Sequence, residues 1–280
     1  MPTTALSSAT ELNGRLLSPL ADDVTGSIKK TEGAGAANHS GNADKLPAAI
    51  GGQKLRDAAA AGNPAAAYEV GVRYLEGRGV TADAGEGMRW LERAAAKGLA
   101  PAQFRLASML EKGHGVKKDV ARARKLYAAA AEQGNGKAMH NLAVLYAEGI
   151  NGRPDYTAAS EWFKKAAERG VSDSQYNLAV LYARGLGVEK NFSESYKWFA
   201  LAAAQGDKEA ANKRDDVAGQ LDARALAKVQ KTVKAWTPQR QPDAAINVPA
   251  PPEGWDEAAP HTAPVKQAAK TSASFQVGKR

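Results

Sequence analysis

The sequence predicts an all-α fold, an α/α solenoid in which helix pairs stack along one axis. The first observation is a glycine that recurs every 36 residues, and the second is that three further positions keep the same interval. A period of this length is typical of a stack of small helical units, none of which buries its apolar face alone. The third is a composition with 6% aromatic residues and abundant alanine, which favours helices packed through small side chains. The recurrent positions are Gly62, Gly98, Gly134, Gly170 and Gly206; Gly77, Gly113, Gly149 and Gly185; Asp83, Asp119, Asp155 and Asn191; and Trp90, Leu126, Trp162 and Trp198.

The first helix of each unit carries apolar and small residues three and four positions apart. This spacing places them on one face, as an amphipathic helix requires. One position of the face is always glycine or alanine, which lets the paired helix approach closely. The face consists of Ala66, Val70, Gly71 and Tyr74 in the first unit, Ala102, Leu106, Ala107 and Leu110 in the second, Ala138, Leu142, Ala143 and Tyr146 in the third, and Ser174, Leu178, Ala179 and Tyr182 in the fourth.

A Gly-x-Gly-Val turn follows this helix at Gly77, Gly113 and Gly185. Glycine adopts positive φ without steric cost, so each of these turns is expected to end its helix. The third unit has a different sequence over residues 149–154, although its total length is unchanged. We expect a locally different loop there and an undisturbed stack.

The second helix of each unit is expected to begin after the recurrent Asp or Asn. The side-chain oxygen of such a residue can accept hydrogen bonds from the unpaired N–H groups of the first turn. Glu86 and Glu194, three residues after Asp83 and Asn191, are predicted to complete capping boxes. The buried side of this helix is predicted to hold Trp90 with Leu91, Trp162 with Phe163, and Trp198 with Phe199.

Composition divides the chain into a repeat region and two tails. Residues 1–50 are rich in Gly, Ala, Ser, Asn and Thr, and we expect a disordered linker. Residues 237–280 contain many prolines, which block helix propagation, so an extended, mobile tail is expected there. Trp255 in this tail is interpreted either as docking back onto the repeats or as an exposed anchor for a partner. The solenoid itself is assigned to residues 51–236: a half-repeat 54–62, four repeats 63–98, 99–134, 135–170 and 171–206, and capping helices 207–236.

The net charge of +8 is modest for 280 residues, and the excess is concentrated in the stretch 117–125. We interpret this stretch as a solvated turn and helix start; an acidic protein partner is the next interpretation, ahead of nucleic acid. No stretch approaches the roughly 18 apolar residues that a membrane span needs. Residues 1–8 lack the basic start and apolar core of a signal peptide, so we expect no membrane span and no export signal.

The residues needed for catalysis or metal binding are not grouped in the sequence. The chain has no cysteine, which excludes disulfides and thiolate sites. None of the four histidines is paired at metal-ligand spacing, and no phosphate loop, nucleophile elbow or His-Glu-x-x-His pattern occurs. We therefore expect a protein that is not an enzyme and takes no cofactor.

The helix-pair motif resembles the Sel1-like repeat, a relative of the tetratricopeptide repeat. The resemblance rests on Ala-x-x-x-Leu/Val-small-x-x-Tyr-x-x-Gly-x-Gly-Val, followed by Trp-Phe/Leu and Ala-Ala-x-x-Gly, in four units over about residues 54–206. It implies a right-handed α/α solenoid. It also implies an adaptor in protein complexes, as is common in bacterial envelope and signalling proteins.

A narrower resemblance lies outside the repeats, to the C-terminal part of PodJ-type polar localisation factors. It rests on the segments 46–52, 211–218 and 248–256. This resemblance implies a periplasmic location, as part of a longer membrane-anchored protein. The alternative is a cytoplasmic protein, because this chain carries no recognisable export signal.

The inner face of the first-helix row is the first candidate for binding a partner, by analogy with tetratricopeptide repeats. Asparagine side chains can fix the backbone of an extended peptide, and aromatic rings supply contact area at low entropic cost. The alternative is that the aromatic residues pack between adjacent units. The candidate residues are Tyr68, Phe104, Arg105, His140, Asn141, Tyr176 and Asn177.

The leading functional hypothesis is therefore a non-enzymatic scaffold or adaptor that binds another protein, in envelope or polar organisation. The alternative is a protein that binds peptidoglycan or another glycan through the basic second repeat and Trp255.

Overall fold

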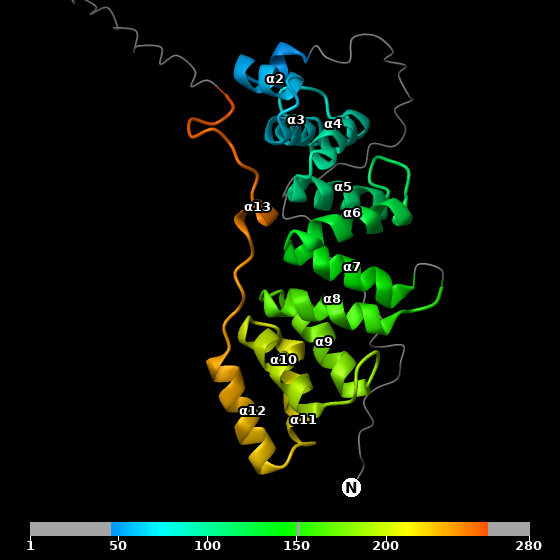
Figure 1. Ribbon diagram of the computed structural model, residues 1–280, viewed down its shortest axis with the longest axis vertical. Coiled ribbons are helices and arrows are strands. Elements are labelled where there is room, and N and C mark those ends of the chain that lie inside the picture. The colour runs from blue at the N-terminus through cyan, green and yellow to red at the C-terminus, as the bar shows by residue number, and fades with distance from the viewer. Residues whose placement is uncertain (1–45, 150–151, 257–280) are drawn as a thin grey trace, which may run out of the picture.

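The computed structural model describes residues 46–149 and 152–256, and every regular element in these two ranges is helical. The helices stack in chain order from α2 to α12, and the chain after α12 returns alongside the stack (Figure 1). The elements are η1 (Ala48–Ile50), α2 (Gln53–Ala60), α3 (Pro64–Glu76), α4 (Ala84–Ala96), α5 (Ala100–Lys112), α6 (Val120–Glu132), α7 (Gly136–Glu148), α8 (Tyr156–Glu168), α9 (Ser172–Arg184), α10 (Phe192–Ala204), α11 (Lys208–Ala218), α12 (Ala223–Ala235) and α13 (Asp243–Ile246).

Each repeat is a pair of helices, α3–α4, α5–α6, α7–α8 and α9–α10, and every helix of these pairs packs against the one before and the one after it. The helix α2 covers the free side of α3, and α12 packs against α10 at the other end. The predicted all-α solenoid is confirmed. The sequence period is also the structural period, because the first helices of the repeats start at Pro64, Ala100, Gly136 and Ser172.

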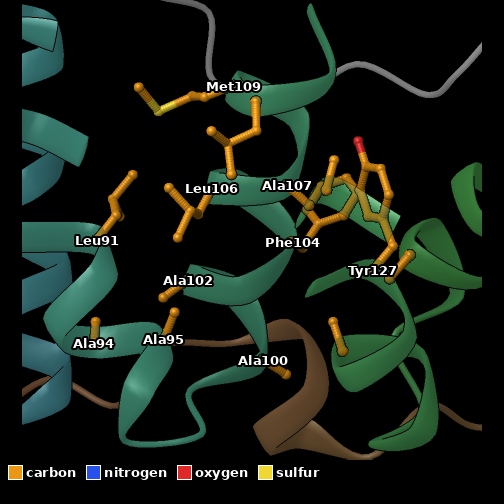
Figure 2. Packing of buried hydrophobic residues seen from close by; sticks show 14 of the residues in the cluster. Leu91, Ala94, Ala95, Ala100, Ala102, Phe104, Leu106, Ala107, Met109 and Tyr127 are labelled. Atoms are coloured by element: carbon orange, nitrogen blue, oxygen red, sulfur yellow. The ribbon is translucent and has the colours of Figure 1, made fainter. Parts of the chain in front are cut away.

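The core runs the length of the stack between the two helix rows. Figure 2 shows it at the second repeat, where Leu106 of α5 faces Leu91 of α4 on one side of the helix and Phe104 of α5 lies beside Tyr127 of α6 on the other side. Two buried clusters make up this core, and they meet in the third repeat. Helix α7 contributes Leu142 to the first cluster and Val144 to the second, so the third repeat joins the two halves.

The predicted helix caps are confirmed, but the predicted capping boxes are wrong. Asp83 and Asn191 accept hydrogen bonds from the backbone N–H groups of Glu86 and Glu194. A capping box would also need the glutamate to accept the backbone N–H of the cap residue. That N–H instead closes the turn, since Asp83 donates to the carbonyl of Tyr74 at 2.9 Å. The Glu86 carboxylate pairs with Arg89, and the Glu194 carboxylate accepts a hydrogen bond from Trp198, so both glutamates bind side chains instead of the backbone N–H of the cap residue.

The aberrant turn of the third unit leaves the stack in register, as expected. The N–H of Asp155 donates to the carbonyl of Tyr146 at 2.9 Å, which is the bond that closes the other three turns. Gly149 has a φ of 80° and a ψ of 103°, whereas Gly77 and Gly185 have ψ near 31° and 38°. The different conformation of Gly149 does not shift α8, which starts at its expected place.

Both predicted tails differ from the structure near the repeats. Residues 48–50 form η1, and Ile50 is completely buried against the first repeat. The Pro-rich stretch is extended over most of residues 237–256, as predicted, and it also contacts the repeats through Gln241, Ala245 and Asp256. Prolines exclude long helices, but they do not prevent an extended chain from docking. The remaining parts of the two predicted tails, 1–45 and 257–280, lie outside the described residues.

Candidate interaction surface

Six of the seven predicted binding residues are buried in the structure. His140 and Asn141 are 0% exposed, and Tyr176 and Asn177 are 1% exposed. Phe104 and Arg105 are also buried, and Tyr68 is half-buried. Side chains with so little exposed area offer a partner almost no contact surface.

The contacts of these side chains connect successive repeats. His140 Nδ1 and Ser174 Oγ lie 2.8 Å apart, which joins α7 to α9, and the Tyr176 hydroxyl donates to Glu209 at 2.5 Å, which joins α9 to α11. The His140 ring also meets Phe163 with ring centroids 5.5 Å apart. The arrangement favours the packing interpretation for the ring positions over the partner-binding one.

Asn141 belongs to a buried polar chain between α5, α6 and α7. Its amide donates to the Tyr127 hydroxyl at 3.0 Å, and that hydroxyl donates to the Glu111 carboxylate at 2.6 Å. Burial raises the pKa of Glu111 despite this hydrogen bond, and it raises the pKa of Tyr127 far above its ordinary value. Asn141, one of the two asparagines among the peptide-binding candidates, therefore satisfies an internal group.

Residues 237–256, here called the C-terminal segment, follow the row of turns that link one repeat to the next. This row, the turn edge, carries the glycines that recur every 36 residues. The segment runs back from α12 toward α2, opposite to the chain order of the repeats (Figure 1). Hydrogen bonds attach it to this edge: Gln239 N–H to the Glu168 carbonyl at 2.8 Å, Gln239 Nε2 to the Glu168 carboxylate at 3.4 Å, Gly136 N–H to Gln241 Oε1 at 2.8 Å, and Asn135 Nδ2 to the Ala245 carbonyl at 2.7 Å.

Two prolines of the segment lie directly on two turn glycines. A Cβ at Gly134 would come within 2.7 Å of Pro242, and a Cβ at Gly170 within 3.3 Å of Pro238. At Gly98 no described atom would lie within 4 Å. Four residues of extended segment therefore cover one repeat of the stack, and the missing side chain of glycine leaves room for each proline ring.

The far end of the segment reaches a site that we call the Arg73 site, formed by Ile50, Gly52, Lys54 and Arg73. Arg73 Nη1 and Nη2 donate to the two carboxylate oxygens of Asp256 at 2.8 and 2.7 Å. Gly52 N–H donates to the same carboxylate at 3.2 Å, and Lys54 pairs with Glu253. The hydrogen bonds from Arg73 hold the pKa of Asp256 below its ordinary value.

Trp255 docks back onto the repeats, which was one of its two interpretations. The side chain is half-buried and packs against the first of the two core clusters. The segments 46–52 and 248–256, about 200 residues apart in the chain, thus meet at the Arg73 site.

A pocket of about 770 Å³ lies at the other end of the segment. Tyr182, Trp198 and Trp236 line it together with the carboxylates of Glu168 and Glu194. Trp198 and Trp236 meet edge to face with ring centroids 6.3 Å apart. Burial, followed by the charges of Glu194 and Glu168, raises the pKa of Tyr182. Lys164 and Lys197 line it as well, so the pocket combines aromatic faces with hydrogen-bonding groups and charges of both signs.

The turn edge and the pocket were not predicted from the sequence. The only available signal for the turn edge was that Pro238 and Pro242 lie four residues apart. This interval could be interpreted only with the distance between successive turns in the folded stack, which the sequence does not give. Within residues 46–149 and 152–256, no group of three or more His, Asp or Glu side chains could hold a metal ion. In the same ranges no helix has both the length and the apolar character to cross a bilayer.

Comparison with known proteins identifies the repeats. The Sel1 repeat family matches residues 64–99, 100–135, 136–171 and 172–207, which is just over half of the chain. No match is found among curated proteins.

Two solved structures illustrate the likeness. A Sel1 repeat protein from Oxalobacter formigenes is 32% identical, with 64% of this chain and 75% of that chain covered and a TM-score of 0.54. A protective antigen of uropathogenic Escherichia coli strains, which displays an SLR fold, is 22% identical, with 65% and 55% covered and a TM-score of 0.34. Because four consecutive repeats match over more than half of its length, the chain belongs to the Sel1 repeat family, whose α-solenoids are in general protein-interaction scaffolds.

Proposed function

We propose that this protein is a non-enzymatic adaptor that binds an extended, proline-containing peptide of a partner along the turn edge. The observation that carries the proposal is the C-terminal segment, an extended peptide already bound there. Asn135 Nδ2 donates to a backbone carbonyl of this peptide, so this contact does not depend on side-chain identity. The prolines supply the selective contacts, since proline is pre-set for extended backbone and loses little entropy on binding.

A peptide of residues 236–247 tests this proposal in trans. The host is the full chain carrying Pro238→Gly and Pro242→Gly, which weakens its own segment and opens the turn edge. We expect fluorescence anisotropy to show that the fluorescein-labelled peptide binds this host. Asn135→Ala in the host should weaken binding at least about tenfold, because the hydrogen bond from the Asn135 side chain is lost and the peptide carbonyl of Ala245 is left without this donor.

Asn63→Ala is the matched control. Asn63 caps α3 as Asn135 caps α7, so both substitutions remove a helix cap worth about 1 kcal/mol, but only Asn135 contacts the segment. Binding that is unchanged by Asn135→Ala, or reduced equally by Asn63→Ala, would sink the turn-edge proposal.

We place the adaptor in bacterial envelope or polar organisation, in the periplasm, with the cytoplasm as the alternative. The support is the resemblance of segments 46–52, 211–218 and 248–256 to PodJ-type polar localisation factors. A fluorescent fusion expressed from the native locus, combined with protease treatment of spheroplasts, checks both points. A diffuse signal protected from protease would contradict them.

A second candidate function is the binding of a glycan such as peptidoglycan, in the pocket beside Trp236. Sugar rings stack on aromatic faces and exchange hydrogen bonds with carboxylate and amide groups, and the pocket has both. The basic second repeat and Trp255 are less suited to this role, because Trp255 packs against the repeats. We expect soluble peptidoglycan fragments to change the tryptophan fluorescence of the full chain, and we expect Trp236→Ala to abolish the change. An unchanged spectrum at millimolar fragment would exclude this function.

A further inference from the structure

We propose that residues 251–256 are a cis ligand of the Arg73 site, and that the trans ligand of this site is an extended segment with an aromatic residue followed by a carboxylate. The inference deepens the proposed adaptor function and rests on it, since it names the chemistry of a second contact made by the same partner class. The site lies outside the four matched repeats except for Arg73 itself.

Arg73 is positioned by contacts besides those with Asp256. Arg73 Nε donates to Glu69 at 2.8 Å, and Nη1 also donates to the Ile50 carbonyl at 2.8 Å. These contacts come from α3 and η1, and with Asp256 bound the Arg73 side chain is 10% exposed. A guanidinium held in one orientation presents a planar fork that fits a carboxylate with two parallel hydrogen bonds. The geometry of the site therefore specifies a carboxylate.

The aromatic residue before the carboxylate is specified by a turn and an apolar contact. Gly254 has a φ of 81°, and its N–H donates to the Pro251 carbonyl at 2.8 Å. This turn directs Trp255 onto the core cluster of the first repeats while Asp256 meets Arg73. A partner segment needs the same pair of neighbouring groups to make both contacts.

The contact is small enough to be displaced. The Asp256 side chain is 58% exposed, and Glu253 and Lys54 are 65% and 42% exposed. Solvent screens ion pairs in which at least one partner is this exposed, so they hold the contact weakly. Among the described residues, no backbone hydrogen bond joins residues 246–253 to the repeats. Residues 251–256, here called the tip, are therefore held separately from the turn edge.

Tethering compensates for the weak contact. A short flexible connection gives a tethered ligand an effective concentration on the order of millimolar. A tip with an intrinsic Kd of roughly 0.1 mM would then occupy the site about 90% of the time and weaken binding of a trans ligand about tenfold. Competition from the tip thus lowers the apparent affinity of the Arg73 site, and only a partner that binds tightly enough to displace the tip occupies the site.

The test uses the full chain with Trp255→Ala and Asp256→Ala, which vacates the site, and a labelled peptide of residues 248–256 as the probe. We expect anisotropy to show binding to this variant and about tenfold weaker binding to the wild-type chain. A probe with Asp256→Asn should lose binding, and so should a host that also carries Arg73→Gln. Arg78→Gln is the matched control, because Arg78 also pairs with Glu69 but donates no described hydrogen bond to Asp256.

A host with Arg73→Lys covers the case in which Arg73→Gln lowers the melting temperature, since lysine keeps the charge and loses the fork. No binding to the vacated chain would overturn the inference, as would equal binding to the Arg73→Lys and parent hosts. Wild-type dimers that disappear on Asp256→Ala would support it, with a second copy as the trans ligand. The 236–247 peptide at the turn edge reports on the adaptor function separately, so either result can fail without the other.

Discussion

Replacing Phe163 with alanine should lower the free energy of unfolding by about 3–5 kcal/mol and separate unfolding into two steps. Phe163 is fully buried in α8, and its ring meets His140. The energy loss follows from the cavity, which neighbouring helices can fill only in part. The separation follows from position, because the third repeat joins the two core clusters and a solenoid is held together by nearest-neighbour contacts.

Hydrogen exchange measured along a urea series would show this separation directly. We expect α3–α6 and α9–α12 to lose protection at different urea concentrations in Phe163→Ala, and together in the wild type. Phe163→Leu is the control, since leucine keeps most of the apolar volume and should retain one transition. A single transition in the alanine variant, with a loss below about 1 kcal/mol, would contradict the role of the third repeat as the junction.

Gly187→Ala should lower the free energy of unfolding by about 2–5 kcal/mol. The φ of Gly187 is 67°, which costs an alanine about 1–2 kcal/mol. An added Cβ would lie 2.1 Å from the carbonyl oxygen of Tyr156, a backbone atom at the start of α8. Relieving that overlap must move the turn of the fourth repeat away from the third, at about 1–3 kcal/mol more.

Gly206→Ala separates the two contributions. Gly206 also has a positive φ, of 97°, but no described atom would lie within 4 Å of its Cβ. We therefore expect it to lose only the backbone contribution, so its urea midpoint should fall less than that of Gly187→Ala. If the two variants are equally destabilised, the close contact between the Gly187 turn and the preceding repeat does not contribute to the loss of stability in Gly187→Ala.

The architecture could be predicted because the signals that define it are local. Asp119 caps α6 through its own neighbours, and Gly113 ends α5 through its own φ, so each boundary depends on a few adjacent residues. The capping boxes failed for a reason that is not local. The N–H of each cap residue bonds to a carbonyl nine residues earlier, and this bond exists only once the turn has formed.

The candidate surface could not be predicted in the same way. Whether Asn141 faces solvent or Tyr127 depends on how closely α7 approaches α6, which is a property of the assembled stack. The docking of Pro238 and Pro242 likewise depends on a match between their spacing and the distance between turns. The composition of residues 237–256 indicates an extended chain, but it carries no information about what that chain contacts.

The Asp256–Arg73 contact changes the mechanics of the molecule. A solenoid in which each repeat contacts only its neighbours can lengthen when its ends are pulled, because each interface between repeats can open slightly. Here the C-terminal segment of 20 residues, at most about 70 Å long when fully extended, connects the end of α12 to the opposite end of the stack. Elongation beyond that length has to detach Asp256 first, so the exposed tip is the point at which tension on the repeats would be released.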